Sequence, residues 1–272
     1  MTTIRQAELT ASSVIDRFEA RLLLAFCLKV NRTYLITHDK DELPEATLNQ
    51  YKDLVQKRAM GVPVPYICGT QEFYGRPFKV TPDVLIPRPD TETLIDFILE
   101  ECPKESPLSL LDMGTGSGCI AITLALENPR FTVSATDISD KALNIAKQNA
   151  KQLKAPVTFY EGSWFDALPA SSQFDVIVSN PPYIHKDDVH LANLKYEPIN
   201  ALTDGFNGLS NIAHIIDRAP DHLKKGGLLA FEHGWDQGGA VRELFNQNNS
   251  WKNVQTIKDL GGNDRVTAAY LV

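Results

Sequence analysis

A four-residue segment combines the residue types needed to hold a planar –NH₂ group: Asn180-Pro181-Pro182-Tyr183. It follows the apolar run 174–179, so we expect it at the carboxyl end of a central strand. Two consecutive prolines donate no backbone hydrogen bonds and keep the chain rigid. The Pro181 carbonyl and the Asn180 side-chain oxygen can then both accept from one –NH₂ group, while Tyr183 stacks on a planar amide or base. Such a site would orient a weak nitrogen nucleophile by positioning alone.

A second segment is rich in glycine and lies between a predicted strand and a predicted helix; it is Asp112-Met113-Gly114-Thr115-Gly116-Ser117-Gly118. Glycines let the backbone approach a ligand closely, and the start of the helix supplies free N–H donors. A dinucleotide fingerprint would have glycine or alanine where this chain has Cys119. The spacing, with Asp112 before the glycines, favours the methionine end of S-adenosyl-L-methionine over a nicotinamide cofactor.

Two further positions complete the predicted cofactor site. Asp137 ends the next predicted strand, where a carboxylate can accept hydrogen bonds from both hydroxyls of a ribose. Trp164 follows the third predicted strand and is the better candidate for an aromatic contact to the adenine, whereas we expect its neighbour Phe165 in the core. An aspartate at a strand end is often only a helix cap, but its pairing with the glycine loop favours the ligand role.

The elements that must position these residues alternate between strand and helix from residue 88 onward. Helices are predicted over 119–127 and 141–153, and another is expected to start at a cap on Asp90. Strands are predicted over 108–113, 131–137, 157–160, 174–179, 227–232, 254–258 and 266–271. This order predicts a largely parallel, Rossmann-like α/β sheet of seven strands with helices on both faces.

The first part of the chain has a different pattern. Apolar residues recur at helical spacing over 14–26 and 48–55, which predicts a small helical domain spanning 1–70. Residues 71–87 are β-rich, with turn residues at 75–77 and 81–83, and we expect a β-hairpin linker there. Residues 88–272 then form the main domain.

Composition and charge exclude several classes of function. No apolar run approaches the roughly 20 residues needed to cross a bilayer, and residues 1–10 lack the apolar stretch of a secretory signal. The four cysteines and six histidines have no metal-ligand spacing, so no metal is expected. The net charge of −7 argues against stable nucleic-acid binding. We therefore expect a soluble, cytoplasmic protein that acts as a monomer.

The sequence resembles the HemK/PrmC type of protein-glutamine methyltransferase over essentially its whole length. The sharpest matches are 180–183 and the segment 86–92, Ile-Pro-Arg-Pro-Asp-Thr-Glu. Other matches are 65–67, 72–73, 112–118, Asp137, Trp164, 196–198, 232–234 and 259–265. The resemblance implies that Asn180 and Pro181 hold a glutamine amide beside Tyr183, that Asp137 binds the ribose, and that the glycine loop binds the methionine moiety. It also implies a class I peptide-chain release factor as partner, methylated in its Gly-Gly-Gln loop and docked with the help of the N-terminal domain.

Alternatives remain at this point. An exocyclic amine of a nucleic-acid base presents the same –NH₂ geometry, but such an enzyme should carry a basic cluster. The densest basic cluster in this chain is Lys224-Lys225, a pattern typical of a helix end before Gly226. A non-catalytic cofactor-binding protein would not need Asn180, and a dehydrogenase is disfavoured by the glycine spacing. Glu197, Glu232 and His233 could support the site or be merely structural.

Overall fold

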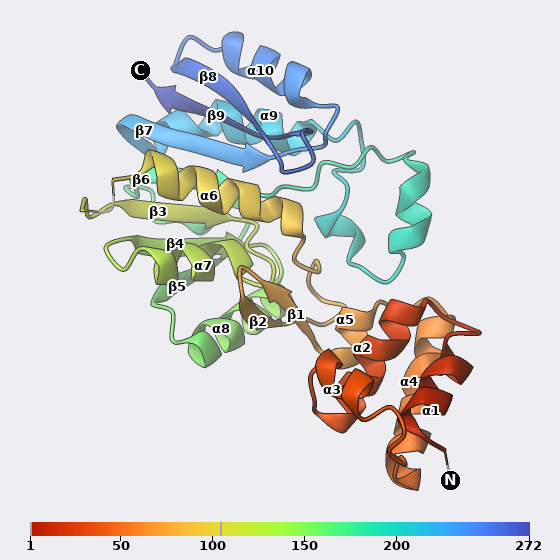
Figure 1. The fold of residues 1–272 in the computed structure, drawn as a ribbon. Helices are drawn as coiled ribbons and strands as arrows, with labels where there is room; N and C mark the ends of the chain where they lie inside the picture. The colour runs from red at the N-terminus through yellow and green to blue at the C-terminus, as the bar shows by residue number, and fades with distance from the viewer. Residues whose placement is uncertain (1, 104) are drawn as a thin grey trace. The chain divides into compact units, whose positions relative to one another are not determined.

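The chain divides at Thr70 into two units in the computed structural model, which describes residues 2–103 and 105–272 (Figure 1). The N-terminal unit is helical and the C-terminal unit contains the predicted α/β sheet. Within the described residues, no helix is both long and apolar enough to cross a membrane.

The N-terminal unit packs five helices around a core that includes Leu23, Leu24 and Tyr51. The hydroxyl of the buried Tyr51 donates to the Ala20 carbonyl at 3.0 Å, so this aromatic ring is buried with its polar atom satisfied. The helices are α1 (Ile4–Ala11), α2 (Arg17–Leu28), α3 (Arg32–Thr37), α4 (Glu45–Ala59) and α5 (Val64–Cys68). The sequence pattern found α2 and α4 but missed the short helices, and Val14, counted in the first pattern, is exposed between α1 and α2.

The predicted hairpin is formed by β1 (Thr70–Phe73) and β2 (Arg76–Lys79). Its turn is Tyr74-Gly75, both at positive φ (50° and 70°), as a two-residue hairpin loop requires. The predicted turn was therefore wrong for Arg76 and Pro77, which lie in β2. The turn needs a second residue at positive φ beside Gly75, and the preceding Tyr74 supplies it. Phe73 and Phe78 pack into the core of the C-terminal unit.

The main sheet has seven strands in the order β5-β4-β3-β6-β7-β9-β8. The bounds are β3 (Ser109–Met113), β4 (Thr132–Asp137), β5 (Val157–Glu161), β6 (Phe174–Ser179), β7 (Leu223–Glu232), β8 (Trp251–Lys258) and β9 (Asp264–Leu271). The first five pair in parallel, and β9 is antiparallel to both β7 and β8. The largely parallel seven-stranded sheet predicted from the sequence is thus confirmed.

Alternate residues of β3 face the two halves of the core. Leu110 packs in the cluster that contains α6 (Glu92–Glu101) and α7 (Cys119–Glu127). Leu111 packs in the opposite cluster with α9 (Ser210–Arg218) and α10 (Gly238–Asn246), so helices cover both faces (Figure 1). The remaining helix is α8 (Asp140–Leu153), and the 3₁₀ turns are Pro89–Thr91, Trp164–Ala167, Val189–Leu194, Ile199–Ala201 and Ala219–Asp221.

Two local predictions were wrong. Asp90 does not cap a helix: it lies in a 3₁₀ turn, and its carboxylate pairs with Arg265 at 3.3 Å because this guanidinium is almost buried and needs anionic partners. Lys224 and Lys225 lie in β7 and do not end a helix. Lys224 pairs with Asp175 on β6 at 2.7 Å, and the glycine after them interrupts the strand register.

Candidate active site

The carboxyl ends of three neighbouring strands bring the predicted site residues to one edge of the sheet. In the sheet register Met113 on β3 lies beside both Thr136 on β4 and Ser179 on β6. The glycine loop, Asp137 and Asn180 follow directly after these three positions. The strand order also reverses at β3, and open α/β sheets bind ligands in the crevice at such a point.

A cavity of about 410 Å³ lies at this edge, within the size range of small-molecule sites. Six predicted site residues line it, namely Gly114, Gly116, Asp137, Trp164, Asn180 and Pro182. Residues that the sequence did not single out also contribute, among them Val84, Leu85, Ile138, Asn200, Thr203, Asp204 and Asn211, and so does Pro198 of the matched segment 196–198. Asp112, Thr115, Ser117, Gly118, Pro181 and Tyr183 are not part of its lining, and the first three are almost fully buried.

Asp137 joins the glycine loop to the start of the next helix. One carboxylate oxygen accepts from the Gly116 N–H at 2.8 Å and the other from the Ser139 N–H at 2.9 Å. Burial raises the pKa of Asp137, while these two hydrogen bonds act in the opposite direction. The Ile138 N–H also acts on this carboxylate, which still has a free lone pair and lines the cavity, so Asp137 can accept from a ligand hydroxyl.

Asp112 lies beneath the glycine loop, fully buried. Its Oδ2 accepts from the Thr115 hydroxyl at 2.6 Å and from the Ala121 N–H at 3.2 Å, while Oδ1 has no partner among the described residues. Burial raises the pKa of Asp112 to about 7, and the two hydrogen bonds offset only part of this effect. Thr136 Oγ1, beside the cavity, is likewise buried without a described partner. Thr136 lines the cavity, so a polar ligand there can complete its hydrogen bonding, whereas Asp112 lies outside the lining.

The loop requires glycine at two positions for different reasons. Gly118 has φ +84°, and a Cβ there would lie 2.8 Å from Cδ1 of Ile122 and 3.1 Å from Cβ of Ala146 on α8, so a side chain would force the start of α7 away from α8. Gly114 has φ +70°, and a Cβ there would lie 3.6 Å from the Trp164 ring, inside the cavity. The open space at Gly114 is therefore available to a ligand. Phe165 is in the core, as predicted.

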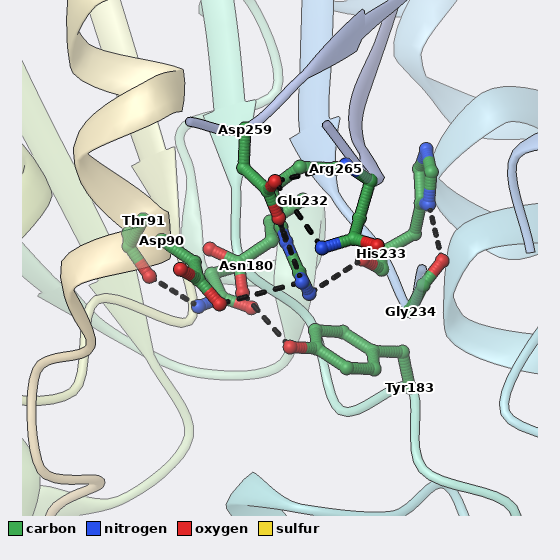
Figure 2. A network of polar contacts seen from close by, with 10 residues as sticks. Asp90, Thr91, Asn180, Tyr183, Glu232, His233, Gly234, Asp259 and Arg265 are labelled. Atoms are coloured by element: carbon green, nitrogen blue, oxygen red, sulfur yellow. Dashed lines mark hydrogen bonds and ion pairs between the residues drawn. The ribbon is translucent and has the colours of Figure 1, made fainter. Parts of the chain in front are cut away.

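On the β6 side, the site residues are held by side chains from distant segments (Figure 2). Asn180 Nδ2 donates to Thr91 Oγ1 at 3.3 Å, and the Tyr183 hydroxyl donates to Glu232 at 2.8 Å. Burial and the Glu232 charge both raise the pKa of Tyr183, so this hydroxyl stays protonated. The Tyr183 carbonyl accepts from Gln237 at 2.9 Å, which fixes the backbone after the two prolines.

A buried guanidinium anchors this side of the site. Arg265, on β9, pairs with Asp259 at 3.1 Å and with Asp90 at 3.3 Å, and also donates to the His233 carbonyl (Figure 2). The segment 259–265 matched the family in the sequence, but nothing there assigned a role to Arg265. Thr91 was missed as well, because a threonine between two acidic residues gives no sign of its partner.

The structure assigns positions to the three residues left open by the sequence. Glu197 accepts from the Ile86 N–H at 3.1 Å and from Arg88 at 2.5 Å, so it fixes the segment that leads into α6. His233 is buried; its Nδ1 contacts the Gly234 carbonyl, so Nε2 is free to accept from Thr267 at 2.8 Å, and burial lowers its pKa. Glu232 contacts Tyr183 directly. None of the three lines the cavity formed by the described residues.

The fold and the arrangement of the site define a Rossmann-like methyltransferase. The methyltransferase small domain family matches residues 90–201, and the PrmC N-terminal domain family matches residues 5–69. The catalytic domain of hMettl16, solved with an RNA hairpin, has the same fold, with a TM-score of 0.60 at 17% identity over 80% of each chain. The 16S rRNA N2 G1207 methyltransferase of Thermus thermophilus, solved with AdoMet and guanosine, gives 0.55 at 17% identity over 75% of this chain and 50% of that one.

A more specific assignment comes from sequence relatives. The release factor glutamine methyltransferase of Neisseria gonorrhoeae is 46% identical over 258 residues, which is 94% of this chain and 93% of the relative. The chain belongs to the release factor glutamine methyltransferase family, and it is an enzyme of the methyltransferase class.

Proposed function

We propose that this enzyme transfers the methyl group of S-adenosylmethionine to the side-chain amide nitrogen of the glutamine in the Gly-Gly-Gln motif of class I peptide-chain release factors. One observation carries the proposal: Asn180 and Pro182 line the same cavity as Gly114, Gly116 and Asp137. A nitrogen held at Asn180 and a cofactor held at the glycine loop would therefore share one enclosed space. The high identity to a release factor glutamine methyltransferase names the substrate class.

The residues around the cavity fit the cofactor. When bound, S-adenosylmethionine supplies an electrophilic methyl group on a sulfonium sulfur. Asp137 would accept from the ribose hydroxyls, and the backbone around Gly114 and Gly116 would lie against the methionine part. Trp164 would close the cavity beside the adenine. Three aspartates, Asp83, Asp137 and Asp204, lie in the lining with no described lysine or arginine, which favours the binding of a positively charged cofactor.

The substrate amide is oriented by acceptors. Asn180 Oδ1 and the Pro181 carbonyl would each accept one N–H of the amide, which directs the nitrogen lone pair at the methyl carbon. Transfer of the methyl group to the amide nitrogen would leave the electron pair of the broken C–S bond on sulfur, and the methylated nitrogen would release one proton to water. No residue has to act as a base before transfer, because an amide bearing a fourth substituent is strongly acidic.

The N-terminal unit would help to dock the release factor, and the enzyme would work as a monomer in the cytoplasm, where translation ends. Several large apolar side chains of this unit are exposed, including Val14, Phe18 and Ile36. Apolar side chains at a surface stabilise a complex when a protein partner covers them. The net charge of −7 favours a basic protein surface over nucleic acid as that partner.

The test is methyl transfer from labelled S-adenosylmethionine to three substrates side by side: a purified class I release factor, ribosomal and transfer RNA, and duplex DNA. We expect label on the release factor only, and labelling about 10²- to 10³-fold slower when Asn180→Ala enzyme is used. Label on RNA or DNA and none on the factor would overturn the proposal in favour of an exocyclic-amine methyltransferase.

A further inference from the structure

The backbone of residues 180–183 is held mainly through its carbonyl groups. Pro181 and Pro182 have no N–H group, so this segment lacks two of the backbone donors that usually fix a chain. Its backbone therefore depends on donors from elsewhere that reach its carbonyl oxygens. Among the described residues two such donors are present, and both are side-chain amides.

The two amides bind the last two carbonyls of the segment. Asn211, on α9, donates from Nδ2 to the Pro182 carbonyl at 3.4 Å. Gln237 donates from Nε2 to the Tyr183 carbonyl at 2.9 Å. No hydrogen bond between described residues reaches the Pro181 carbonyl, which is the acceptor that the proposed function assigns to the substrate amide. This arrangement leaves that carbonyl available to the substrate.

The direction of the Gln237 carboxamide is determined by two backbone groups. Its Oε1 accepts from the Gly234 N–H at 2.8 Å, while its Nε2 donates to the Tyr183 carbonyl. A backbone N–H only donates and a backbone carbonyl only accepts, so the reversed amide would lose both hydrogen bonds. Gln237 therefore connects the turn between β7 and α10 to the end of segment 180–183 in one orientation.

A glycine lies directly against this hydrogen bond. Gly208 is buried and has φ +79°. A Cβ at this position would lie 2.0 Å from the Tyr183 carbonyl oxygen and 2.8 Å from Gln237 Nε2. Any side chain at position 208 would therefore displace the carbonyl, the amide or both.

Asp204 holds Gly208 in this place. Its Oδ1 accepts from the N–H groups of Phe206 and Gly208 at 2.8 and 3.0 Å. Its Oδ2 accepts from the Ser210 N–H at 2.9 Å. One carboxylate thus binds three backbone donors of the loop 204–210, and the position of Gly208 is set by the loop itself.

We propose that Gln237 and Gly208 are positioning residues for the transfer step. Together they fix the Tyr183 carbonyl, and through the rigid prolines they keep the Pro181 carbonyl where it accepts from the substrate amide. Neither residue belongs to the described lining of the cavity, so both act through segment 180–183. The inference rests on the proposed function.

The test compares alanine at two glycines of the same loop. Gly208→Ala places a Cβ against the Tyr183 carbonyl. Gly205→Ala is the matched control, because Gly205 also has a positive φ, +77°, but a Cβ there meets nothing within 4 Å. Both variants carry the strain of an alanine at positive φ, and they differ in the contact with Tyr183. Release-factor methylation gives kcat and KM, and calorimetry gives the cofactor Kd.

We expect Gly208→Ala to lower kcat about 10- to 100-fold, because relief of the 2.0 Å contact shifts the carbonyl by about 1 Å, and misplacement on this scale costs up to about 10²-fold. Gly205→Ala should keep kcat within about 3-fold of the wild type, below the loss expected for one hydrogen bond. Cofactor Kd and the KM for the release factor should change by less than about 2-fold in both variants, because only positioning in the transfer step is altered.

A second pair of variants tests the amide. Gln237→Glu keeps an acceptor for the Gly234 N–H but replaces the donor to the Tyr183 carbonyl with an oxygen. Its kcat should fall about 10-fold, the effect of one lost hydrogen bond on positioning. Gln255→Glu adds the same charge at an exposed position of β8 and should change kcat by less than about 3-fold.

Equal kcat values within either pair would overturn the inference, and so would a loss of cofactor affinity as large as the loss of kcat. If Gly208→Ala does not fold, the comparison of Gln237→Glu with Gln255→Glu decides the matter by the same criterion. Absence of release-factor methylation by the wild-type enzyme is a different result, which would overturn the proposed function itself.

Discussion

The two halves of the candidate site are built in different ways. On the β3–β4 side, the loop is organised by local contacts. Asp112 contacts Thr115, and Asp137 contacts Gly116 and Ser139. The partners in these contacts are at most 21 residues apart in the sequence. On the β6–β7 side, Asn180 and Tyr183 contact Thr91 and Glu232, which are 89 and 49 residues away. The proposed cofactor half is thus a local motif, and the proposed substrate half is held by contacts between distant segments.

This difference suggests that the two halves have different functions. A local loop of backbone donors can bind one common cofactor in many enzymes, because it depends little on the rest of the chain. Contacts from distant segments hold Asn180 and Tyr183, so the proposed substrate side depends on the tertiary fold. We therefore expect changes in the first half to weaken cofactor binding, and changes in the second half to slow transfer at saturating cofactor.

The largest effect is expected at Asn180. Asn180→Ala removes a proposed acceptor for the substrate amide, and kcat should fall about 10²- to 10³-fold, as when one positioned polar group is lost from an active site. Cofactor Kd, measured by calorimetry, should change by less than about 3-fold, because the loop and Asp137 are intact. A loss of cofactor affinity as large as the loss of kcat would contradict the proposed difference between the two halves.

The reverse pattern is expected at Asp137. Asp137→Ala removes the proposed acceptor for the ribose and the acceptor of the Gly116 N–H, so the KM for cofactor should rise about 10- to 100-fold, as expected for hydrogen bonds to a charged group. Initial rates over a wide cofactor range should show kcat nearly recovered at saturation. A kcat that stays low at every cofactor concentration would place Asp137 in the transfer step.

A smaller effect is expected at Tyr183. Tyr183→Phe keeps the ring but leaves buried Glu232 without its 2.8 Å donor, which should lower the free energy of unfolding by about 1–3 kcal/mol. We expect kcat to fall about 10-fold as the segment loses its anchor, the factor that corresponds to about 1.4 kcal/mol. Urea unfolding and steady-state kinetics measure the two effects. Unchanged stability would mean that the Glu232 contact does not hold this segment.

The smallest and most pH-dependent effect is expected at Asp112. Its pKa rises from 3.8 to about 7 on folding, so the folded state binds the proton more tightly than the unfolded state. Stability therefore falls as pH rises from 3.8 to about 7 and levels off above it. Asp112→Asn keeps an acceptor for Thr115 and Ala121 but has no charge to bury.

The gain in melting temperature of Asp112→Asn over wild type should therefore be larger at pH 8 than at pH 5, by thermal unfolding at both values. A gain that does not change with pH would show that Asp112 is not ionising in this range.

The contrast between the halves also explains what the sequence could predict. The glycine loop, helix 119–127 and strand 174–179 follow from contiguous patterns, and the structure has the latter two at the predicted bounds. Thr91, Glu232 and Arg265 meet only after the sheet has formed, so no local pattern indicates their contacts. The Lys224-Lys225 pair was misjudged because a glycine after two lysines fits a helix end as well as an interrupted strand.

The most direct test of the account is to locate the methyl group on the product. A native class I release factor is incubated with the enzyme and S-adenosylmethionine, digested, and its peptides are sequenced by mass spectrometry, beside a factor with the Gly-Gly-Gln glutamine replaced by alanine. The account predicts one methyl group on the amide nitrogen of that glutamine, and none on the alanine factor. A methyl group on another residue, or equal methylation of both factors, would contradict it.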